Sequence, residues 1–322
     1  MKILLTGAAG FVGSHTAERL LEAGHTVTGV DNFDPYYAPE IKRRNVAAAL
    51  SKHAERYRMV EGDFGDPALL ARELPGCDAV IHLAAQAGVR PSLEDPLRYQ
   101  RINVANVVAL LEALRKHGPR KLVAASSSSV YGNVTPAPFR EDAPCAQPQS
   151  PYGASKRAGE IYCGSYAQLY GLRIVVVRPF TVYGPRQRPD MAIAAFARKI
   201  LLGEPITLFG DGSSARDYTY VADIVSGLMG ALQADIPFGI YNLGGDRPYE
   251  LRELVALLEK ATGKRAAVNF APMQAGDVER TCADLTRSRR DLGFAPKFSL
   301  EEGLRHTVAW VREELAREGR QV

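Results

Sequence analysis

The sequence predicts an α/β protein in which a doubly wound parallel sheet is joined to a smaller C-terminal α/β domain. Three observations support this fold class. Short apolar runs alternate with helical patterns through the first half of the chain, as in parallel sheets that are covered on both faces. A glycine-rich segment directly follows the first apolar run. After about residue 178, proline and glycine become frequent and the strict alternation ends.

Six apolar runs of strand length occur in the first half. Strands are expected at Lys2–Thr6, Thr26–Asp31, Tyr57–Glu61, Ala79–Leu83, Lys121–Ser126 and Arg173–Arg178. Helical patterns lie between them at Phe11–Ala23, Leu97–Lys116 and Pro151–Tyr170, and Gly24 marks the end of the first. Because crossovers between parallel strands are right-handed, this order predicts a doubly wound sheet within residues 1–178.

Residues 179–322 are expected to form the smaller second domain. Helices are predicted there at Met191–Leu202, Val221–Leu232, Leu251–Thr262 and Leu300–Glu318, mixed with short strands. The segment 216–244 is a candidate to return to the first sheet, because Arg216–Tyr220 and Ile240–Leu243 have strand patterns. The two domains are therefore not expected to be separated at a single position in the sequence.

The composition excludes several classes of protein. The net charge of +4 comes from 40 basic and 36 acidic residues that are scattered along 322 positions, so no nucleic-acid partner is expected. The four cysteines and six histidines lack the spacings of metal sites, so no metal is expected. No apolar stretch reaches the roughly 18 residues that span a bilayer, and Met1 is followed by a strand pattern rather than a signal peptide. The sequence predicts a cytoplasmic protein without a membrane partner.

The segment Thr6-Gly7-Ala8-Ala9-Gly10-Phe11-Val12-Gly13 follows the first strand and begins the first helix. In this position Gly7 allows a tight turn, Gly10 lets the backbone approach a pyrophosphate, and Gly13 lets helix and strand pack closely. The helix N-terminus then offers free N–H groups to the phosphates. We therefore expect a Rossmann domain over 1–178 that binds a dinucleotide through Gly7, Gly10, Phe11, Val12 and Gly13.

Two acidic residues end the next two strands. Asp31, beside Asn32, can accept hydrogen bonds from the adenosine ribose and would repel a 2′-phosphate. No Lys or Arg occurs from 32 to 41 to neutralise such a phosphate, which favours NAD over NADP. Asp63 and Phe64 follow the third strand and are expected near the adenine.

Tyr152 and Lys156 stand four residues apart on the helix that begins at Pro151, so they share one helix face. A tyrosine with a pKa of about 10 is a weak base, and a nearby ammonium is expected to lower that pKa. Ser127, Ser128 and Ser129 follow the fifth strand, at the sheet edge where doubly wound folds bind ligands. The three features together predict acid–base chemistry beside the dinucleotide.

The chain resembles the extended short-chain dehydrogenase/reductase family, the nucleotide-sugar epimerases and dehydratases, over nearly its whole length. The motifs are T-G-A-A-G-F-V-G at 6–13, H-L-A-A-Q at 82–86, S-S-S-S-V-Y-G at 126–132, Y-G-A-S-K at 152–156, Y-G-P-R at 183–186 and R-D-Y-T-Y-V-A-D at 216–223. The resemblance implies that Ser127 binds the sugar 4-oxygen, Tyr152 is the base, and Lys156 holds the nicotinamide ribose. It also implies that Ala84, Ala85 and Asn103 line or support the cofactor channel, and that Arg216 and Asn242 contact uridine and phosphate.

Members of this family commonly form homodimers through the two helices that correspond to 97–116 and 151–170. The resemblance therefore implies a homodimer. Val104, Val107, Val108, Leu111 and Leu114 offer enough apolar surface for it, although the core of one chain can use the same residues.

The reaction depends on the groups beside the sugar. The 4,6-dehydratases that resemble this chain carry Asp-Glu where Ser128 and Ser129 stand, and UDP-glucuronate decarboxylases usually carry Glu at the second position. With no carboxylate to act at C5 or C6, the 4-keto sugar is expected to receive its hydride back on the other face. The resemblance thus implies an NAD-dependent 4-epimerase. The alternative outside the enzymes is a protein that binds a nucleotide without catalysing a reaction. Loss of Tyr152 or Lys156 from the sequence would have indicated it.

Within the family the sequence is most similar to UDP-glucuronate 4-epimerases. The likeness lies in residues 31–37, 87–90, 188–192 and 273–278 and in Thr181. It implies substrate contacts from Arg90, Ser128, Ser129, Thr181, Arg188, Arg216 and Asp277. Arg186-Gln187 and Arg280 depart from that group, so a UDP-glucose/UDP-galactose 4-epimerase stays open as the alternative.

Overall fold

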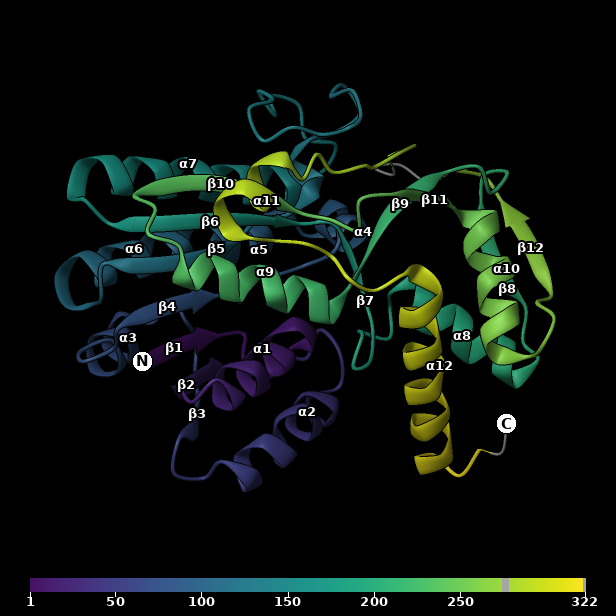
Figure 1. Cartoon of the computed structure of the whole chain (residues 1–322), viewed down its shortest axis with the longest axis horizontal. Helices are drawn as coiled ribbons and strands as arrows, with labels where there is room; N and C mark the ends of the chain where they lie inside the picture. Colours follow the sequence, from purple (N-terminus) through teal and green to yellow (C-terminus); the bar gives the residue numbers. More distant parts are fainter. Residues whose placement is uncertain (274–277, 321–322) are drawn as a thin grey trace.

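A seven-stranded parallel sheet is the centre of the computed structural model, which describes residues 1–273 and 278–320 (Figure 1). Its strands are β1 (Lys2–Thr6), β2 (Thr26–Asp31), β3 (Tyr57–Glu61), β4 (Ala79–His82), β5 (Lys121–Ala125), β6 (Arg173–Pro179) and β10 (Phe238–Leu243). They lie in the order β10-β6-β5-β4-β1-β2-β3, and every neighbouring pair is parallel. The order reverses between β1 and β4, which is where doubly wound sheets bind their ligands.

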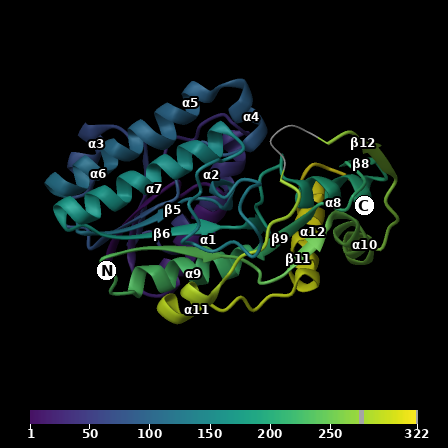
Figure 2. The ribbon, with the colours of Figure 1, turned by 90° about the horizontal axis from the view of Figure 1, so that it is seen from above.

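Helices cover both faces of this sheet (Figure 2). One face carries α3 (Pro67–Glu73), α4 (Val89–Glu94), α5 (Pro96–Gln100), α6 (Asn106–His117) and α7 (Pro151–Tyr170). The other face carries α1 (Phe11–Glu22), α2 (Pro39–Lys52), α9 (Val221–Gln233) and α11 (Thr286–Leu292). The central strands β1, β4, β5 and β6 are buried on both faces, so their residues are mostly apolar.

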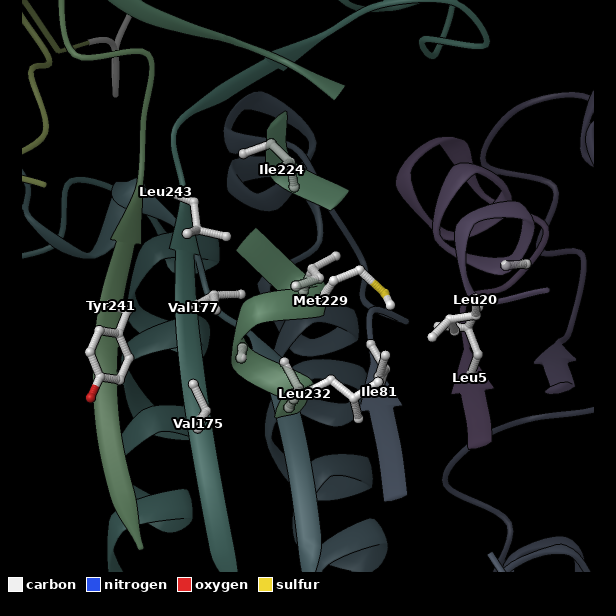
Figure 3. Close-up of a cluster of buried hydrophobic side chains, with 14 of the residues drawn as sticks. Leu5, Leu20, Ile81, Val175, Val177, Ile224, Met229, Leu232, Tyr241 and Leu243 are labelled. Carbon is white, nitrogen blue, oxygen red and sulfur yellow. The ribbon is translucent and has the colours of Figure 1, made fainter. Parts of the chain in front are cut away.

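Alternate residues of each strand enter two different cores. Val175 and Val177 of β6 pack against α9, in a cluster that also includes Leu20 of α1 (Figure 3). Val176, between them, packs on the opposite side with Leu110 of α6. The two-residue period of the strand thus distributes one apolar run between both helix layers.

A smaller unit stands at the C-terminal edge of the sheet, on the right of Figure 1. Its helices are α8 (Ala192–Leu202), α10 (Leu251–Thr262) and α12 (Leu300–Arg317). They enclose a separate core that includes Ile200, Leu254 and Leu304. Two small sheets complete the unit: β11 (Pro248–Glu250), β9 (Ala215–Tyr220) and β7 (Thr181–Tyr183) form one, and β12 (Val268–Ala271) pairs with β8 (Ile206–Phe209) in the other.

The structure confirms the predicted fold class and corrects two elements. Phe238–Leu243 does return to the main sheet beside β6, but Ala215–Tyr220 lies in the small sheet with β7 and β11 instead. The helix expected at Leu97–Lys116 is divided into α5, a π-helical turn η1 (Arg101–Ala105) and α6. The division at residue 178 itself stays a prediction.

The residues that end the fourth to sixth strands differ from the predicted ones by a single position. The helix Pro151–Tyr170 has the predicted bounds, because Ser150 caps its N-terminus at Gly153 N (3.1 Å) and Gly171 ends it in the left-handed conformation. Within the part of the chain that the structure describes, no helix is both long and apolar enough to cross a membrane.

Candidate active site

A cleft runs along the carboxyl ends of β1 to β5, and Arg188 reaches it from the segment after β7. Fourteen of the predicted site residues line it: Gly7, Gly10, Phe11, Val12, Gly13, Asp31, Asn32, Asp63, Phe64, Ala84, Ala85, Tyr152, Lys156 and Arg188. These residues come from six separate stretches of the chain. The fold therefore collects the predicted cofactor residues, the Tyr-Lys pair and one predicted substrate residue in one place.

The glycine loop between β1 and α1 has no room for side chains. Gly7 has a φ of +71°, and a Cβ there would lie 2.7 Å from Ala84 N. A Cβ on Gly13 would lie 1.9 Å from Gly7 O, so α1 can approach the loop only with glycine at this position. Gly10, Phe11, Val12 and Gly13, at the start of α1, line the cleft. This cradle fits the pyrophosphate of a dinucleotide.

Asp31 lies at the end of β2 with both carboxylate oxygens already engaged. Oδ2 accepts a hydrogen bond from Ala9 N at 3.0 Å, and Oδ1 accepts one from Phe33 N at 2.9 Å. Burial raises the pKa of Asp31, while the Phe33 bond and the charge of Lys42 oppose that rise. Each oxygen retains a second lone pair, so the carboxylate can still accept from ribose hydroxyl groups.

Lys42 was missed by the sequence argument, which considered only positions 32 to 41. It lies on α2, lines the cleft, and donates from Nζ to Asp34 O at 2.7 Å. Its stem brings the ammonium over the Tyr37 ring, 4.7 Å from the centroid. The cofactor end of the cleft therefore does contain a cation, held by a backbone carbonyl.

The loop after β4 is tied to helix α7 by one buried amide. Asn103, in the π-helical turn η1, accepts from Gln86 N at 2.8 Å and donates to Gln86 O at 2.9 Å. Its amide also donates to Ser155 Oγ at 3.0 Å. Asn103 thus supports the cleft wall formed by Ala84 and Ala85 without lining the cleft itself, as its predicted supporting position requires.

Tyr152 and Lys156 occupy successive turns of α7 and both line the cleft. Lys156 Nζ donates to Ala125 O, the last carbonyl of β5, at 2.6 Å. Burial lowers the pKa of Lys156 to about 8, and the charge of Glu160 opposes that fall. Ser127 lies two residues after the last residue of β5, and its hydroxyl group hydrogen-bonds to Ser129 Oγ at 3.2 Å.

The expected lowering of the Tyr152 pKa by Lys156 stays a prediction, because other groups set this pKa in the structure. Burial raises the pKa of Tyr152. The Ser127 hydrogen bond and then the charge of Arg188 lower it, and together they do not offset burial. The lysine ammonium is turned to Ala125 O. The cation that acts on the tyrosine in this structure is Arg188, which lies 36 residues further along the chain.

A buried ion pair stands behind the Tyr-Lys face of α7. Arg178 of β6 donates from Nε and Nη2 to Glu160 Oε1 and Oε2, at 2.7 and 2.8 Å, with both side chains almost wholly excluded from solvent. Ser126 Oγ, in the cleft wall, also donates to Glu160 Oε1 at 2.6 Å. Burial raises the pKa of Glu160, but these bonds bring it below its ordinary value. The pair anchors the serine segment to α7.

Replacing Arg178 by Met should lower the free energy of unfolding by about 3–5 kcal/mol, because it leaves the Glu160 carboxylate buried without its bidentate partner. Urea unfolding at pH 7 measures this loss. Arg173→Met is the matched control, since Arg173 lies on the same strand and pairs with the exposed Asp235. Exposed pairs contribute about 0–1 kcal/mol, so an equal loss in both variants would contradict the role of the buried pair.

Arg188 reaches the cleft from the segment between β7 and α8. Its Nε and Nη2 donate to Asp190 Oδ1 and Oδ2 at 3.0 and 2.9 Å. The guanidinium lies over the Tyr36 ring, 5.6 Å from its centroid, and Tyr36 OH donates to Asp190 Oδ2 at 3.4 Å. Sequence reasoning found Arg188 but not Asp190 or Tyr36. Residues 31–37 and 188–192, which carry the family likeness, include Tyr36 and Asp190, but neither stretch indicates the contact between them.

The other predicted substrate residues that the structure describes are not among those that line the cleft. Arg90, on α4, stacks on Phe209 of β8, 4.6 Å from the ring centroid, and so connects the two units of the molecule. Arg216 donates to Ala215 O and Glu279 O. Thr181 begins β7, and Ser128 and Ser129 form a short 3₁₀ turn η2 (Ser128–Val130). Asp277 lies outside the described residues.

Asn242 has a different role from the predicted contact with uridine or phosphate. Its side chain is fully buried and accepts from Tyr131 OH at 2.7 Å. Its amide donates to Phe139 O and Asp284 O at 2.8 and 3.1 Å. All of these partners belong to the protein, so Asn242 joins β10 to two loops, and the predicted substrate contact is wrong.

Comparison with known proteins gives consistent matches over the whole chain. The model of the family described as NAD dependent epimerase/dehydratase matches residues 3–244. A UDP-glucuronate 4-epimerase of Thermodesulfobacterium geofontis is 41% identical over 97% of this chain and 96% of its own length.

Two solved structures show the same fold. The UDP-glucuronic acid 4-epimerase from Bacillus cereus, in complex with UDP-glucuronic acid and NAD, has 36% identity and a TM-score of 0.91, and the match covers 98% of this chain and all of that one. A UDP-glucose 4-epimerase from Thermotoga maritima with UDP-glucose has 34% identity and a TM-score of 0.88, with the same coverage.

Proposed function

The chain belongs to the NAD dependent epimerase/dehydratase family, and we propose that it converts UDP-glucuronate to UDP-galacturonate by NAD-dependent 4-epimerisation. The observation that carries the choice of sugar is the position of Arg188. Its guanidinium lines the cleft, and its charge acts on the Tyr152 hydroxyl. A cation next to the acid–base group suits a sugar whose carboxylate stands one carbon from the reacting centre.

Bound NAD supplies a hydride acceptor that takes the C4 hydrogen of the sugar and returns it to the opposite face. The glycine loop holds the pyrophosphate, and Asp31 accepts hydrogen bonds from the adenosine ribose. Asp63 and Phe64 lie at the adenine end, and Lys156 holds the nicotinamide ribose. Tyr152 removes the proton of the C4 hydroxyl group, with Ser127 hydrogen-bonded to the same oxygen, and gives the proton back when the hydride returns.

The acidic residues of the cleft support epimerisation over dehydration. Among the described residues that line it, the carboxylates are Asp31, Asp34 and Asp63. Asp31 ends β2, Asp34 follows it and Asp63 follows β3, so all three lie at the cofactor end. Elimination at C5 and C6 needs an acid and a base beside the sugar. Ser128 and Ser129 stand instead on the turn after β5, where their hydroxyl groups can hydrogen-bond the sugar. The 4-keto sugar therefore keeps its substituents.

Incubation of the protein with UDP-glucuronate, UDP-glucose and a TDP-hexose, each followed by NMR, tests the proposal. UDP-galacturonate should accumulate from UDP-glucuronate at a higher kcat/KM than UDP-galactose from UDP-glucose. The neutral-hexose epimerase is the second candidate, and the structural match to the Thermotoga maritima enzyme favours it. A preference for UDP-glucose would establish that second candidate, and no turnover of any sugar would indicate an idle nucleotide-binding protein.

Protein as purified should contain NAD(H), because the hydride is returned in every cycle and release of the cofactor is unnecessary. Extraction of the bound nucleotide and its identification by mass spectrometry measure this. The Asp31 carboxylate would face the extra phosphate of NADP, and Lys42 is already hydrogen-bonded to Asp34 O. Recovery of NADP(H) would contradict the argument from Asp31.

A homodimer in the cytoplasm completes the proposal, through the two predicted helices but with other apolar residues than those named from the sequence. Val107, Leu111 and Leu114 pack inside the chain, in the core beneath α6. Exposed apolar residues lie instead on α5 and α7, which contact each other: Leu97, Ile161, Tyr162, Leu169 and Tyr170. Sedimentation of the wild type and of a Leu169→Glu variant tests this interface, since a charge there should shift the protein to monomers.

A further inference from the structure

Asp190 forms a close ion pair with Arg188, a residue that lines the cleft, and the proposed reaction assigns no role to this aspartate. Its two carboxylate oxygens accept hydrogen bonds from Nε and Nη2 of Arg188. Tyr36, from the loop after β2, donates a further hydrogen bond to the same carboxylate. Tyr36 also lines the cleft, and its ring lies under the guanidinium. Two elements that are more than 150 residues apart in the sequence thus hold one arginine side chain in place.

An arginine has two edges that can each bind a carboxylate through two parallel hydrogen bonds. Asp190 occupies the edge formed by Nε and Nη2. The edge formed by Nη1 and the second N–H of Nη2 is left, and no hydrogen bond from Nη1 to a described residue is recorded. Because Arg188 lines the cleft, this second edge is available to an acidic ligand there.

We infer that Asp190, with Tyr36, is a positioning residue that holds Arg188 with its free edge toward the sugar and so sets the preference for a carboxylated sugar over a neutral one. The inference rests on the proposed function. An unpaired arginine side chain loses rotamer freedom when it binds a ligand, which weakens binding. Asp190 restricts the rotamers of Arg188 before the substrate binds, so less conformational entropy is lost on binding. The guanidinium then lies between two carboxylates, one from the protein and one from the substrate.

The alternative is that Asp190 competes with the substrate for Arg188, and two observations oppose it. The two carboxylates would use different edges of the guanidinium. The Asp190 side chain is also 45% exposed, so water screens its repulsion of a second carboxylate. Burial raises the pKa of Asp190, but the Arg188 bonds bring it below its ordinary value, so the residue stays ionised at neutral pH.

Binding of UDP-glucuronate and UDP-glucose to the NAD-loaded protein tests the inference, with Tyr152→Phe as the background so that neither ligand is turned over. Asp190→Ala should weaken UDP-glucuronate about tenfold and UDP-glucose less than twofold, as measured by calorimetry. Asp190→Asn, which retains one acceptor oxygen, should give an intermediate loss. Adding Asp190→Ala to Arg188→Ala should cause no further loss, since both act through one guanidinium.

Asp142→Ala is the matched control. Asp142 accepts Nε and Nη2 of Arg140 at 3.2 and 3.0 Å, which is the same Arg-x-Asp arrangement on a surface away from the cleft. It should change neither affinity. If Asp190→Ala weakened the binding of both ligands equally, the role of Asp190 would be purely structural. If it made UDP-glucuronate bind more tightly, Asp190 would compete with the substrate. Either result overturns the inference. A parent protein that does not prefer UDP-glucuronate would contradict the proposed function instead.

Discussion

Tyr152→Phe should reduce turnover of UDP-glucuronate by about 10² or more, the usual scale for removing a general base. The proton of the C4 hydroxyl group then has no acceptor as the hydride leaves. The fold should be retained, because the Tyr152 ring packs edge-on against Tyr99 at 6.1 Å between centroids and phenylalanine can keep that contact. Single-turnover kinetics and the NAD content of the purified variant measure the two effects separately.

The control is Tyr162→Phe, which removes a phenol from the same helix at an exposed position. Its turnover and NAD content should match those of the wild type. The assignment of Tyr152 as the base would be lost if Tyr152→Phe turned over at the wild-type rate. Loss of NAD together with activity would instead show that the hydroxyl is needed to build the cofactor site.

Arg188→Ala should lower kcat/KM for UDP-glucuronate by one to two orders of magnitude and that for UDP-glucose much less. A charge-assisted hydrogen bond contributes about 1.5–3 kcal/mol, and each 1.36 kcal/mol corresponds to a factor of about ten. A neutral hexose has no carboxylate for the free edge of the guanidinium. Thr181 begins β7, in the same segment of the chain, and we propose that its hydroxyl group fixes the second oxygen of the carboxylate.

The same variant should also release a 4-keto-pentose and CO₂, and in each such event the hydride taken from C4 stays on the cofactor as NADH. The 4-keto sugar is a β-keto acid, which loses CO₂ when the C5–C6 bond aligns with the carbonyl π system. In that step the C5–C6 electron pair moves into the enolate, which takes a proton at C5. A guanidinium that grips the carboxylate prevents the alignment, and alanine does not. Mass spectrometry beside the epimer assay detects the side product.

Arg140→Ala is the control for this prediction, because Arg140 has the same bidentate aspartate partner but does not line the cleft. It should leave the product ratio unchanged. Intact turnover of UDP-glucuronate in Arg188→Ala would contradict the carboxylate contact and would favour the neutral-hexose epimerase.

Local features of the sequence predicted most of the fold and the cofactor half of the site. Strand and helix periodicities, the Pro151 start of α7 and the glycine spacing at 7, 10 and 13 depend on residues that are neighbours along the chain. The i, i+4 spacing of Tyr152 and Lys156 has the same local origin. Their position in one cleft then followed from the general rule that parallel strands present their carboxyl ends at one edge of the sheet.

The partner of each side chain was decided only by the tertiary structure. Packing turns Lys156 toward Ala125 O and leaves Arg188 as the cation that acts on Tyr152. It also buries Asn242 among protein donors and acceptors, so that a residue of the substrate pattern joins loops instead.

Arg188 was predicted from the sequence, but its pairing with Asp190 above the Tyr36 ring was not. Likewise, Ala215–Tyr220 has a strand pattern that fits either sheet, and only its pairing with β7 and β11 decides between them. Periodicity in the sequence indicates which face of a helix or strand is apolar. A contact between residues 36 and 190 depends instead on how the fold places two loops next to each other. That information belongs to the packing of the whole chain, so the sequence determined the site's parts and the fold decided how they act on each other.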